Sequence, residues 1–168
     1  MSNTPNITIR PALDSDYDSI YQIWMEGVEI SFDLEKVNLI EAAQNFKSNF
    51  KCRNGVFNFW VAIVDDKIVG WQSLIRNSYH PFRQNALAES STYLSKHYRF
   101  GGLGQMLMNY AIEEAKKSAL EYIIGHVVTT NKAALKITKE TGWQIVGVLP
   151  PSPTAGEEIS KYLMVRPV

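Results

Sequence analysis

The chain has 168 residues, of which 45% are hydrophobic and 20% are charged, as is typical of one globular domain with a sizeable core. Seventeen basic and seventeen acidic residues cancel, so no net charge attracts nucleic acid or an anionic membrane surface. We therefore expect a small-molecule partner, and neither nucleic acid nor a membrane.

Cysteine usage and the N-terminal sequence indicate the compartment. Cys52 is the single cysteine and cannot form an internal disulfide, so we interpret it as structural. The first residues lack a basic segment followed by an apolar stretch, and no apolar run approaches the length of a membrane span. These features predict a cytoplasmic protein that forms one domain over residues 1–168.

The first half of the chain predicts a strand, two helices and a hairpin. A strand over 7–10 ends at Pro11, after which a helix begins. Its apolar residues recur at helical spacing and indicate a buried face: Tyr17, Ile20, Tyr21, Trp24 and Val28. The pattern breaks from Gly27 to Asp33, and a second helix follows over 38–51. Strands over 56–64 and 67–75 are joined by the turn Asp65-Asp66.

The second half predicts a third consecutive strand and then alternating helices and strands. An irregular connection over 76–85 precedes the strand over 86–95. The later elements are a helix over 102–117, a strand over 122–128, a helix over 131–141, and strands over 143–148 and 159–165. This order predicts an α/β sandwich with a mixed sheet.

A glycine-rich turn joins the strand over 86–95 to the next helix. In Arg99-x-x-Gly102-x-Gly104, free N–H groups at a helix N-terminus favour an anion. Glycines at 101, 102 and 104 allow close approach to the main chain, and Arg99 adds a charged donor. The turn predicts a phosphate-bearing cofactor. Alternatively, the glycines serve only to let the strand-to-helix turn pack closely.

Several spaced motifs carry a resemblance to a known family. They are Arg99-x-x-Gly102-x-Gly104, then Asn131-x-x-Ala134, then Glu140-Thr141-Gly142-Trp143. With the element order, they resemble the GNAT N-acetyltransferase superfamily. Three stretches resemble its phosphinothricin and methionine sulfoximine acetyltransferase branch: 24–32, Glu89-Ser90-Ser91-Thr92-Tyr93-Leu94, and 146–150. The resemblance implies a GNAT-like mixed central β-sheet flanked by α-helices on both faces.

The resemblance also implies acetyl-CoA as the co-substrate. Its pyrophosphate would lie on the glycine-rich turn, and main-chain N–H groups near Leu94, freed where the fourth and fifth strands diverge, would stabilise the oxyanion. Asn131 would bind the pantetheine arm, and as an alternative or in addition it would cap a helix. The implied cofactor-binding residues are Leu94, Arg99, Phe100, Gly101, Gly102, Leu103, Gly104 and Asn131.

Glu89 is the candidate general base. An α-amino group with a pKa of about 8 is mostly protonated at neutral pH and cannot attack a thioester, and Glu89 matches the branch's carboxylate on the fourth strand. Its alternative role is a charged residue on a solvated strand face. Thr138 stands where the family usually carries Tyr or His as proton donor to the CoA thiolate. Here water would protonate that thiolate instead. His97 and His126 could substitute as proton carriers, although isolated histidines are more often surface or core residues. No residues have metal-ligand spacing.

For the acyl acceptor, the candidates are Phe32, Arg76 and Arg83, because a small amino acid needs an aromatic wall and a guanidinium for its carboxylate. Both arginines could equally be solvated loop residues. The resemblance implies direct attack by the primary amine of a small amino acid or analogue, such as phosphinothricin or methionine sulfoximine, in a homodimer. The alternatives are a non-catalytic acyl-CoA-binding module and an acetyltransferase of a peptide or protein N-terminus.

Overall fold

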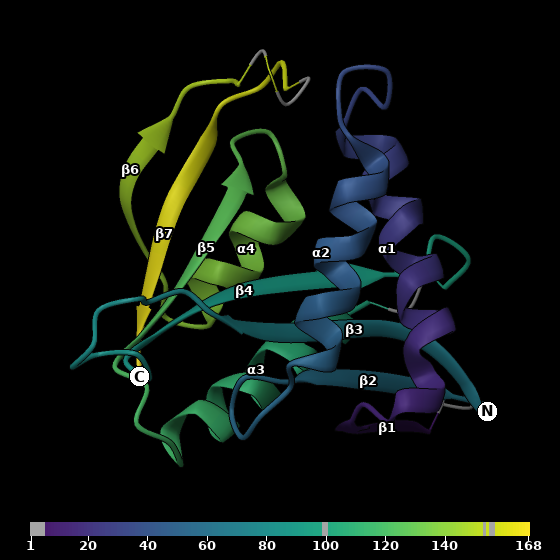
Figure 1. The fold of residues 1–168 in the computed structure, drawn as a ribbon. Helices are drawn as coiled ribbons and strands as arrows, with labels where there is room; N and C mark the ends of the chain where they lie inside the picture. Colours follow the sequence, from purple (N-terminus) through teal and green to yellow (C-terminus); the bar gives the residue numbers. More distant parts are fainter. Residues whose placement is uncertain (1–5, 99–100, 153, 155–156) are drawn as a thin grey trace.

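The computed structural model describes residues 6–98, 101–152, 154 and 157–168, and its strands form one mixed sheet (Figure 1). The strands are β1 (Ile7–Pro11), β2 (Phe59–Val64), β3 (Lys67–Arg76), β4 (Leu87–Leu94), β5 (Tyr122–Val128), β6 (Gln144–Leu149) and β7 (Lys161–Pro167). The helices are α1 (Tyr17–Ser31), α2 (Leu39–Lys51), α3 (Leu103–Lys116) and α4 (Lys132–Glu140), with a 3-10 turn, η1 (Asp14–Asp16). The predicted fold class and element order are confirmed.

The sheet has the strand order β1-β2-β3-β4-β5-β7-β6. Neighbours from β1 to β4 pair antiparallel, whereas β4 and β5 pair parallel. A parallel pair needs a long crossover connection, and α3 provides it. Pairing between β4 and β5 covers only the residues from Leu87 to Glu89, and beyond that point the two strands diverge (Figure 1). A gap therefore opens within the sheet.

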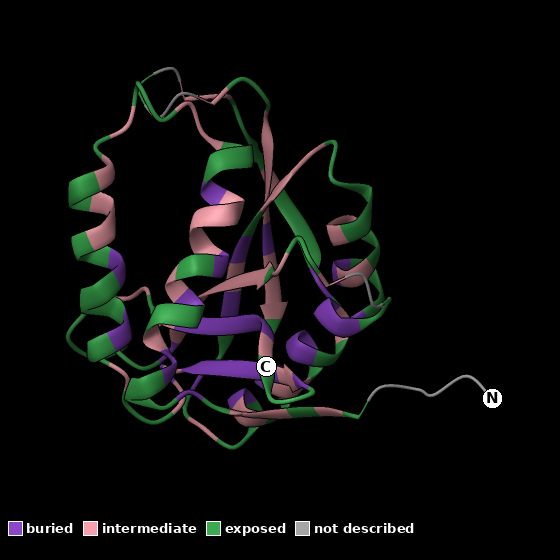
Figure 2. Cartoon of the chain, turned by 90° about the vertical axis from the view of Figure 1, so that its right-hand side faces the viewer, coloured by how far each residue is buried: buried purple, intermediate pink, exposed green. Residues whose placement is uncertain are grey.

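Helices cover both faces of the sheet, because successive strand residues point to opposite faces. On one face, α1 and α2 pack against Phe59, Val61 and Trp71, and they lie in front of the sheet in Figure 1. On the other face, α3 packs against Trp60 and Leu74. Figure 2 shows the buried strands between these partly exposed helices. The hydrophobic core is thus two layers divided by the sheet.

The helix α1 differs from its prediction at one glycine. The sequence predicted a break from Gly27 to Asp33, which is wrong because α1 continues to Ser31. A Cβ at Gly27 would lie 2.4 Å from Cε1 of Tyr93. The glycine therefore lets the helix pack closely on the ring of Tyr93, which itself stacks on Trp71 at a centroid distance of 4.8 Å.

We expect Gly27→Ala to lower the free energy of unfolding by about 1–3 kcal/mol, because the added methyl group would overlap the Tyr93 ring. Helix propensity alone would favour alanine by about 1 kcal/mol. The sign of the change in the free energy of unfolding therefore distinguishes steric overlap from helix propensity. Urea unfolding measures the change. In a Tyr93→Ala background the same substitution should be neutral or stabilising, and equal destabilisation in both backgrounds would contradict the explanation.

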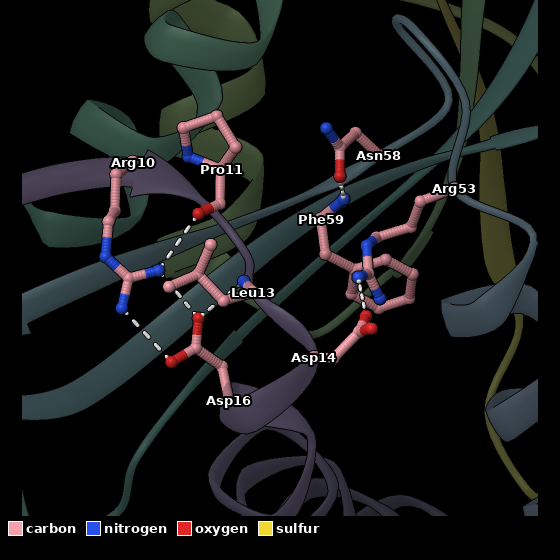
Figure 3. Close-up of polar contacts among 8 residues, drawn as sticks. All are labelled: Arg10, Pro11, Leu13, Asp14, Asp16, Arg53, Asn58 and Phe59. Carbon is pink, nitrogen blue, oxygen red and sulfur yellow. Dashed lines mark hydrogen bonds and ion pairs between the residues drawn. The ribbon is translucent and has the colours of Figure 1, made fainter.

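A polar cluster fixes the start of α1 (Figure 3). The guanidinium of Arg10 donates two hydrogen bonds to the carboxylate of Asp16, at 2.6 and 3.1 Å. The main-chain N–H of Leu13 donates to the same carboxylate at 2.7 Å. Asp16 is buried, and these bonds, Arg10 first, hold the pKa of its carboxyl below the ordinary value of 3.8. The cluster therefore anchors α1 to the end of β1.

We expect Asp16→Asn to reduce the free energy of unfolding by about 1–3 kcal/mol at neutral pH. Because the folded-state pKa is depressed, the carboxylate contributes fully above its unfolded value of 3.8 and loses this contribution as pH falls through the folded-state pKa. The deficit of the variant should therefore shrink below a pH of about 4. Urea unfolding across pH measures it, with Asp66→Asn in the exposed β2–β3 turn as control. A deficit that stays constant down to pH 2 would contradict the assignment.

Candidate functional site

A cavity of about 400 Å³ occupies the gap between β4 and β5. Its lining comes from the end of α1, from β4 and β5, from α3 and α4, and from the start of β7. Because successive residues of β4 point to opposite faces, the cavity is lined from both sides of the sheet. Gly104, Asn131 and Thr138 line it on the side of α3 and α4, and Phe32 and Glu89 on the side of α1. Two molecules can therefore meet at the gap from opposite faces.

The gap also exposes main-chain donors of β4. The N–H of Ser95 donates to the carbonyl of Val69 at 2.9 Å, toward β3. Hydrogen bonds alternate along an antiparallel pair, so the N–H groups of Thr92 and Leu94 point away from β3. The pairing with β5 ends at Glu89. These two donors therefore face the gap, in the place predicted for groups that would stabilise an oxyanion near Leu94.

The glycine-rich turn lies at the start of α3. Arg99 and Phe100 fall outside the described residues. Gly102 has a φ of 90°, in the left-handed region, and a Cβ there or at Gly101 would meet nothing within 4 Å. At Gly104 a Cβ would lie 3.1 Å from Cδ1 of Ile137 in α4. The first two described glycines thus leave the turn open, whereas Gly104 allows α3 to pack closely on α4.

We expect Gly102→Ala to lower the free energy of unfolding by about 1–2 kcal/mol, because a side chain in the left-handed region is strained. Gly147→Ala is the matched control, since it has equally open space and its φ is not positive. Thermal and urea unfolding measure both variants. Equal stability changes at the two positions would show that backbone strain is not the cause.

Asn131 and Thr138 lie on the side of the cavity formed by α4. The side-chain oxygen of Asn131 accepts from the N–H of Ala134 at 3.0 Å, so the predicted helix cap is present. The hydroxyl of Thr138 donates to the carbonyl of Leu135 at 3.0 Å. The Thr138 proton is therefore directed into its own helix rather than toward the gap.

Glu89 lies at the last paired position of β4, where the gap begins. One carboxylate oxygen accepts from the Nδ2 of Asn77 at 2.9 Å. The other lies 3.3 Å from Nδ1 of His126, on β5. In the described part of the chain, the one basic side chain within ion-pair distance of Glu89 is that of His126. The carboxylate is thus oriented by neighbours and remains partly exposed to the cavity.

The three predicted acceptor residues do not come together. Phe32 lines the cavity, but Arg76 and Arg83 are absent from its described lining. The guanidinium of Arg76 lies 4.4 Å from the ring centroid of Phe57 and donates to the side-chain oxygen of Asn85. Arg76 follows the position paired with Glu89, so it points to the opposite face. The guanidinium of Arg83 pairs with a surface carboxylate, that of Glu121, at 2.6 Å.

Sequence reasoning missed one cation in the cavity. Lys161, the first residue of β7, lines the cavity beside Phe32, and its Nζ lies 5.7 Å from the Phe32 ring centroid. The proximity depends on the register of β7 against β5, which pairs Lys161 with Val128. No local sequence pattern predicts that register, so Lys161 could not be identified from the sequence. His126 could be noted there only as an isolated histidine.

The described residues lack a membrane-spanning helix and a metal-binding cluster. None of the helices there is both long and apolar enough to cross a bilayer. Across the same residues, no His, Cys, Asp or Glu side chains form a group of three or more that could hold a metal ion. Cys52 is exposed at the end of α2, away from the lining of the cavity.

Comparisons with known proteins give one family match and several solved structures with a similar fold. Residues 17–143 match the family model described as acetyltransferase (GNAT) family. The chain is similar to a "putative phosphinothricin N-acetyltransferase", with a TM-score of 0.78, 21% identity, and coverage of 97% of this chain and 99% of that one. It is similar to ribosomal-protein-alanine N-acetyltransferase from Brucella melitensis, with a TM-score of 0.77, 24% identity, and coverage of 96% and 99%. It is also similar to yncA from Salmonella typhimurium, solved with its cofactor acetyl-CoA, with a TM-score of 0.77, 19% identity, and coverage of 96% and 94%. The chain therefore belongs to the acetyltransferase (GNAT) family.

Proposed function

We propose that this GNAT acetyltransferase acetylates the primary amine of a small amino acid or analogue, with Glu89 as general base. The observation that carries the proposal is the position of Glu89. It lies in the cavity where β4 and β5 separate, on the same side of the sheet as Phe32, and its carboxylate is oriented by Asn77 and His126. An amine approaching from this side would meet a base at the gap.

The described residues fit acetyl-CoA, which supplies an activated acyl thioester when bound. The N–H groups of Thr92 and Leu94 face the gap and can donate to a carbonyl oxygen. The open turn at Gly101 and Gly102 precedes a helix N-terminus, which favours a diphosphate. By the family resemblance, the remaining contacts would be Arg99, Phe100, Leu103, Gly104 and Asn131. The structure of yncA with acetyl-CoA supports this choice of cofactor through a shared fold.

The reaction needs two proton transfers, and we assign the first to Glu89 and the second to water. Glu89 would accept the proton of the acceptor ammonium, directly or through one water, which frees the lone pair for attack. His126 touches the other carboxylate oxygen and lies at the cavity surface, so it can pass the proton to solvent. The hydroxyl of Thr138 donates its hydrogen bond to the carbonyl of Leu135, so water would protonate the departing thiolate.

The choice of acceptor rests on two supports. The sequence motifs resemble the phosphinothricin and methionine sulfoximine branch, and one similar structure is named for phosphinothricin. Phe32 supplies an aromatic wall on the side of the cavity that Glu89 faces. We place the enzyme in the cytoplasm as a homodimer, for which exposed apolar side chains on β6 offer a surface: Ile145, Val146 and Val148.

Two rival functions each have an observation in their favour. A non-catalytic acyl-CoA-binding module is favoured by Thr138, which replaces the usual proton donor and whose hydroxyl is engaged within α4. An acetyltransferase of a protein N-terminus is favoured by the similarity to ribosomal-protein-alanine N-acetyltransferase. The acceptor panel must therefore include peptides with a free N-terminal alanine.

We expect Glu89→Gln to lower kcat about 10²–10⁴-fold at neutral pH, because glutamine cannot take a proton. The assay is thiol release from acetyl-CoA with phosphinothricin, methionine sulfoximine, other amino acids and N-terminal peptides. Calorimetry should show unchanged acetyl-CoA affinity. Glu121→Gln, an exposed carboxylate paired with Arg83, is the control and should retain wild-type kcat.

The outcomes separate the three functions. Release that depends on a small amino acid and falls in Glu89→Gln supports the proposal. Release with peptides alone indicates an N-terminal acetyltransferase. Binding of acetyl-CoA without release for any acceptor indicates the binding module, and full activity of Glu89→Gln would remove Glu89 as the base.

A further inference from the structure

Lys161 is the one lysine or arginine among the described residues that line the cavity. Its side chain is 24% exposed, so it is mostly buried yet reaches the cavity. Partial burial makes a charged ammonium seek an opposite charge or hydrogen-bond acceptors. Glu157 supplies one such partner, and the donors that remain on the ammonium suit an anionic group on the molecule that the cavity binds.

The sheet places Lys161 and Glu89 on the same face. The register pairs Val128 with Lys161 and His126 with Leu163, so Lys161 and His126 are diagonal neighbours on one face, with Cα atoms roughly 7–8 Å apart. Nδ1 of His126 in turn lies 3.3 Å from a carboxylate oxygen of Glu89. The order across this face is therefore carboxylate, imidazole, ammonium.

The contacts of Lys161 leave it able to bind a ligand. Its Nζ donates to the carboxylate of Glu157, and it lies 5.7 Å from the Phe32 ring centroid. An ammonium has three donors, and Glu157 uses one of them. The hydrogen bond from Lys161 holds the pKa of the Glu157 carboxyl below its ordinary value, and Glu157 in turn orients the ammonium.

We propose that Lys161 binds the carboxylate of the acceptor amino acid while Glu89 receives its amine. The inference rests on the proposed function and narrows its substrate class to amines that carry a free carboxylate. A zwitterion fits this arrangement: its ammonium meets Glu89, and its carboxylate meets the donors of Lys161 that Glu157 leaves available. Lys161 thus takes the role that the sequence suggested for Arg76 and Arg83, whose guanidinium groups are engaged outside the cavity.

The test compares each acceptor with its own α-carboxamide, which keeps the amine and removes the negative charge of the α-carboxylate. For Lys161→Met we expect KM for phosphinothricin or methionine sulfoximine to rise about 10–100-fold, the range for a lost hydrogen bond to a charged group. KM for the α-carboxamides and for acetyl-CoA should stay unchanged, and kcat should change little. Lys161→Arg should restore most of the affinity, and Lys51→Met, on the exposed end of α2, is the control for loss of one positive charge.

Equal losses for the acid and its carboxamide would overturn the inference, because a structural role does not discriminate between them. An unchanged KM in Lys161→Met would overturn it as well. So would a loss confined to acceptors with a second anion in their side chain, since Lys161 would then bind that anion instead.

Calorimetry of methionine sulfoximine and its carboxamide separates this inference from the proposed function. If the wild type acetylates no amino acid, the proposed function fails. The inference still stands if the wild type binds the acid more tightly than the carboxamide and Lys161→Met loses that preference. It fails if the wild type binds both equally, or if the preference survives in Lys161→Met.

Discussion

The short parallel pairing of β4 and β5 is the constraint on which the rest of the structure depends. It covers only the residues from Leu87 to Glu89, while each strand keeps a full antiparallel partner on its other side. Those outer partners hold both strands in place, so β4 and β5 can separate in the middle of the sheet while each stays paired on its other side. Because the strands separate, the main-chain N–H groups of Thr92 and Leu94 face the cavity. The geometry of the candidate site therefore depends first on backbone pairing, before any side chain is considered.

Local patterns predicted most elements, because helical and strand periodicity reflect which face each residue buries. They failed where a tertiary contact or a tight turn decides the outcome. Gly27 suggested a break in α1, yet the ring of Tyr93 occupies the space beside it. The strand predicted from 56 begins at Phe59, because Asn54 and Phe57 form a separate bridge across the turn at Gly55. In both cases a tertiary contact or a turn overrides propensity.

The candidate site divides in the same way. Glu89, Asn131 and Phe32 lie in the cavity, and the motifs that pointed to them are local runs of sequence. Arg76 was a reasonable candidate by proximity along the chain, but the pleat of β3 turns it to the other face. Lys161 has no local signal, because its place depends on how β7 pairs with β5. Residues brought together by strand register are thus the ones that a single sequence conceals.

The chemistry of the cavity lining favours direct transfer over a covalent acyl-enzyme. Cys52 lies outside the described lining, whose aliphatic hydroxyl side chains are those of Ser31, Ser90, Ser91, Thr92 and Thr138, and the hydroxyls of Ser90 and Thr138 are already engaged. The hydroxyl of Ser90 accepts from the Nε2 of Gln72 at 2.7 Å, and that of Thr138 donates to a main-chain carbonyl. A nucleophilic hydroxyl needs a base within hydrogen-bonding reach, and neither of these partners is one. Access from both faces of the sheet makes such an intermediate unnecessary, because donor and acceptor can occupy the gap together and react by proximity.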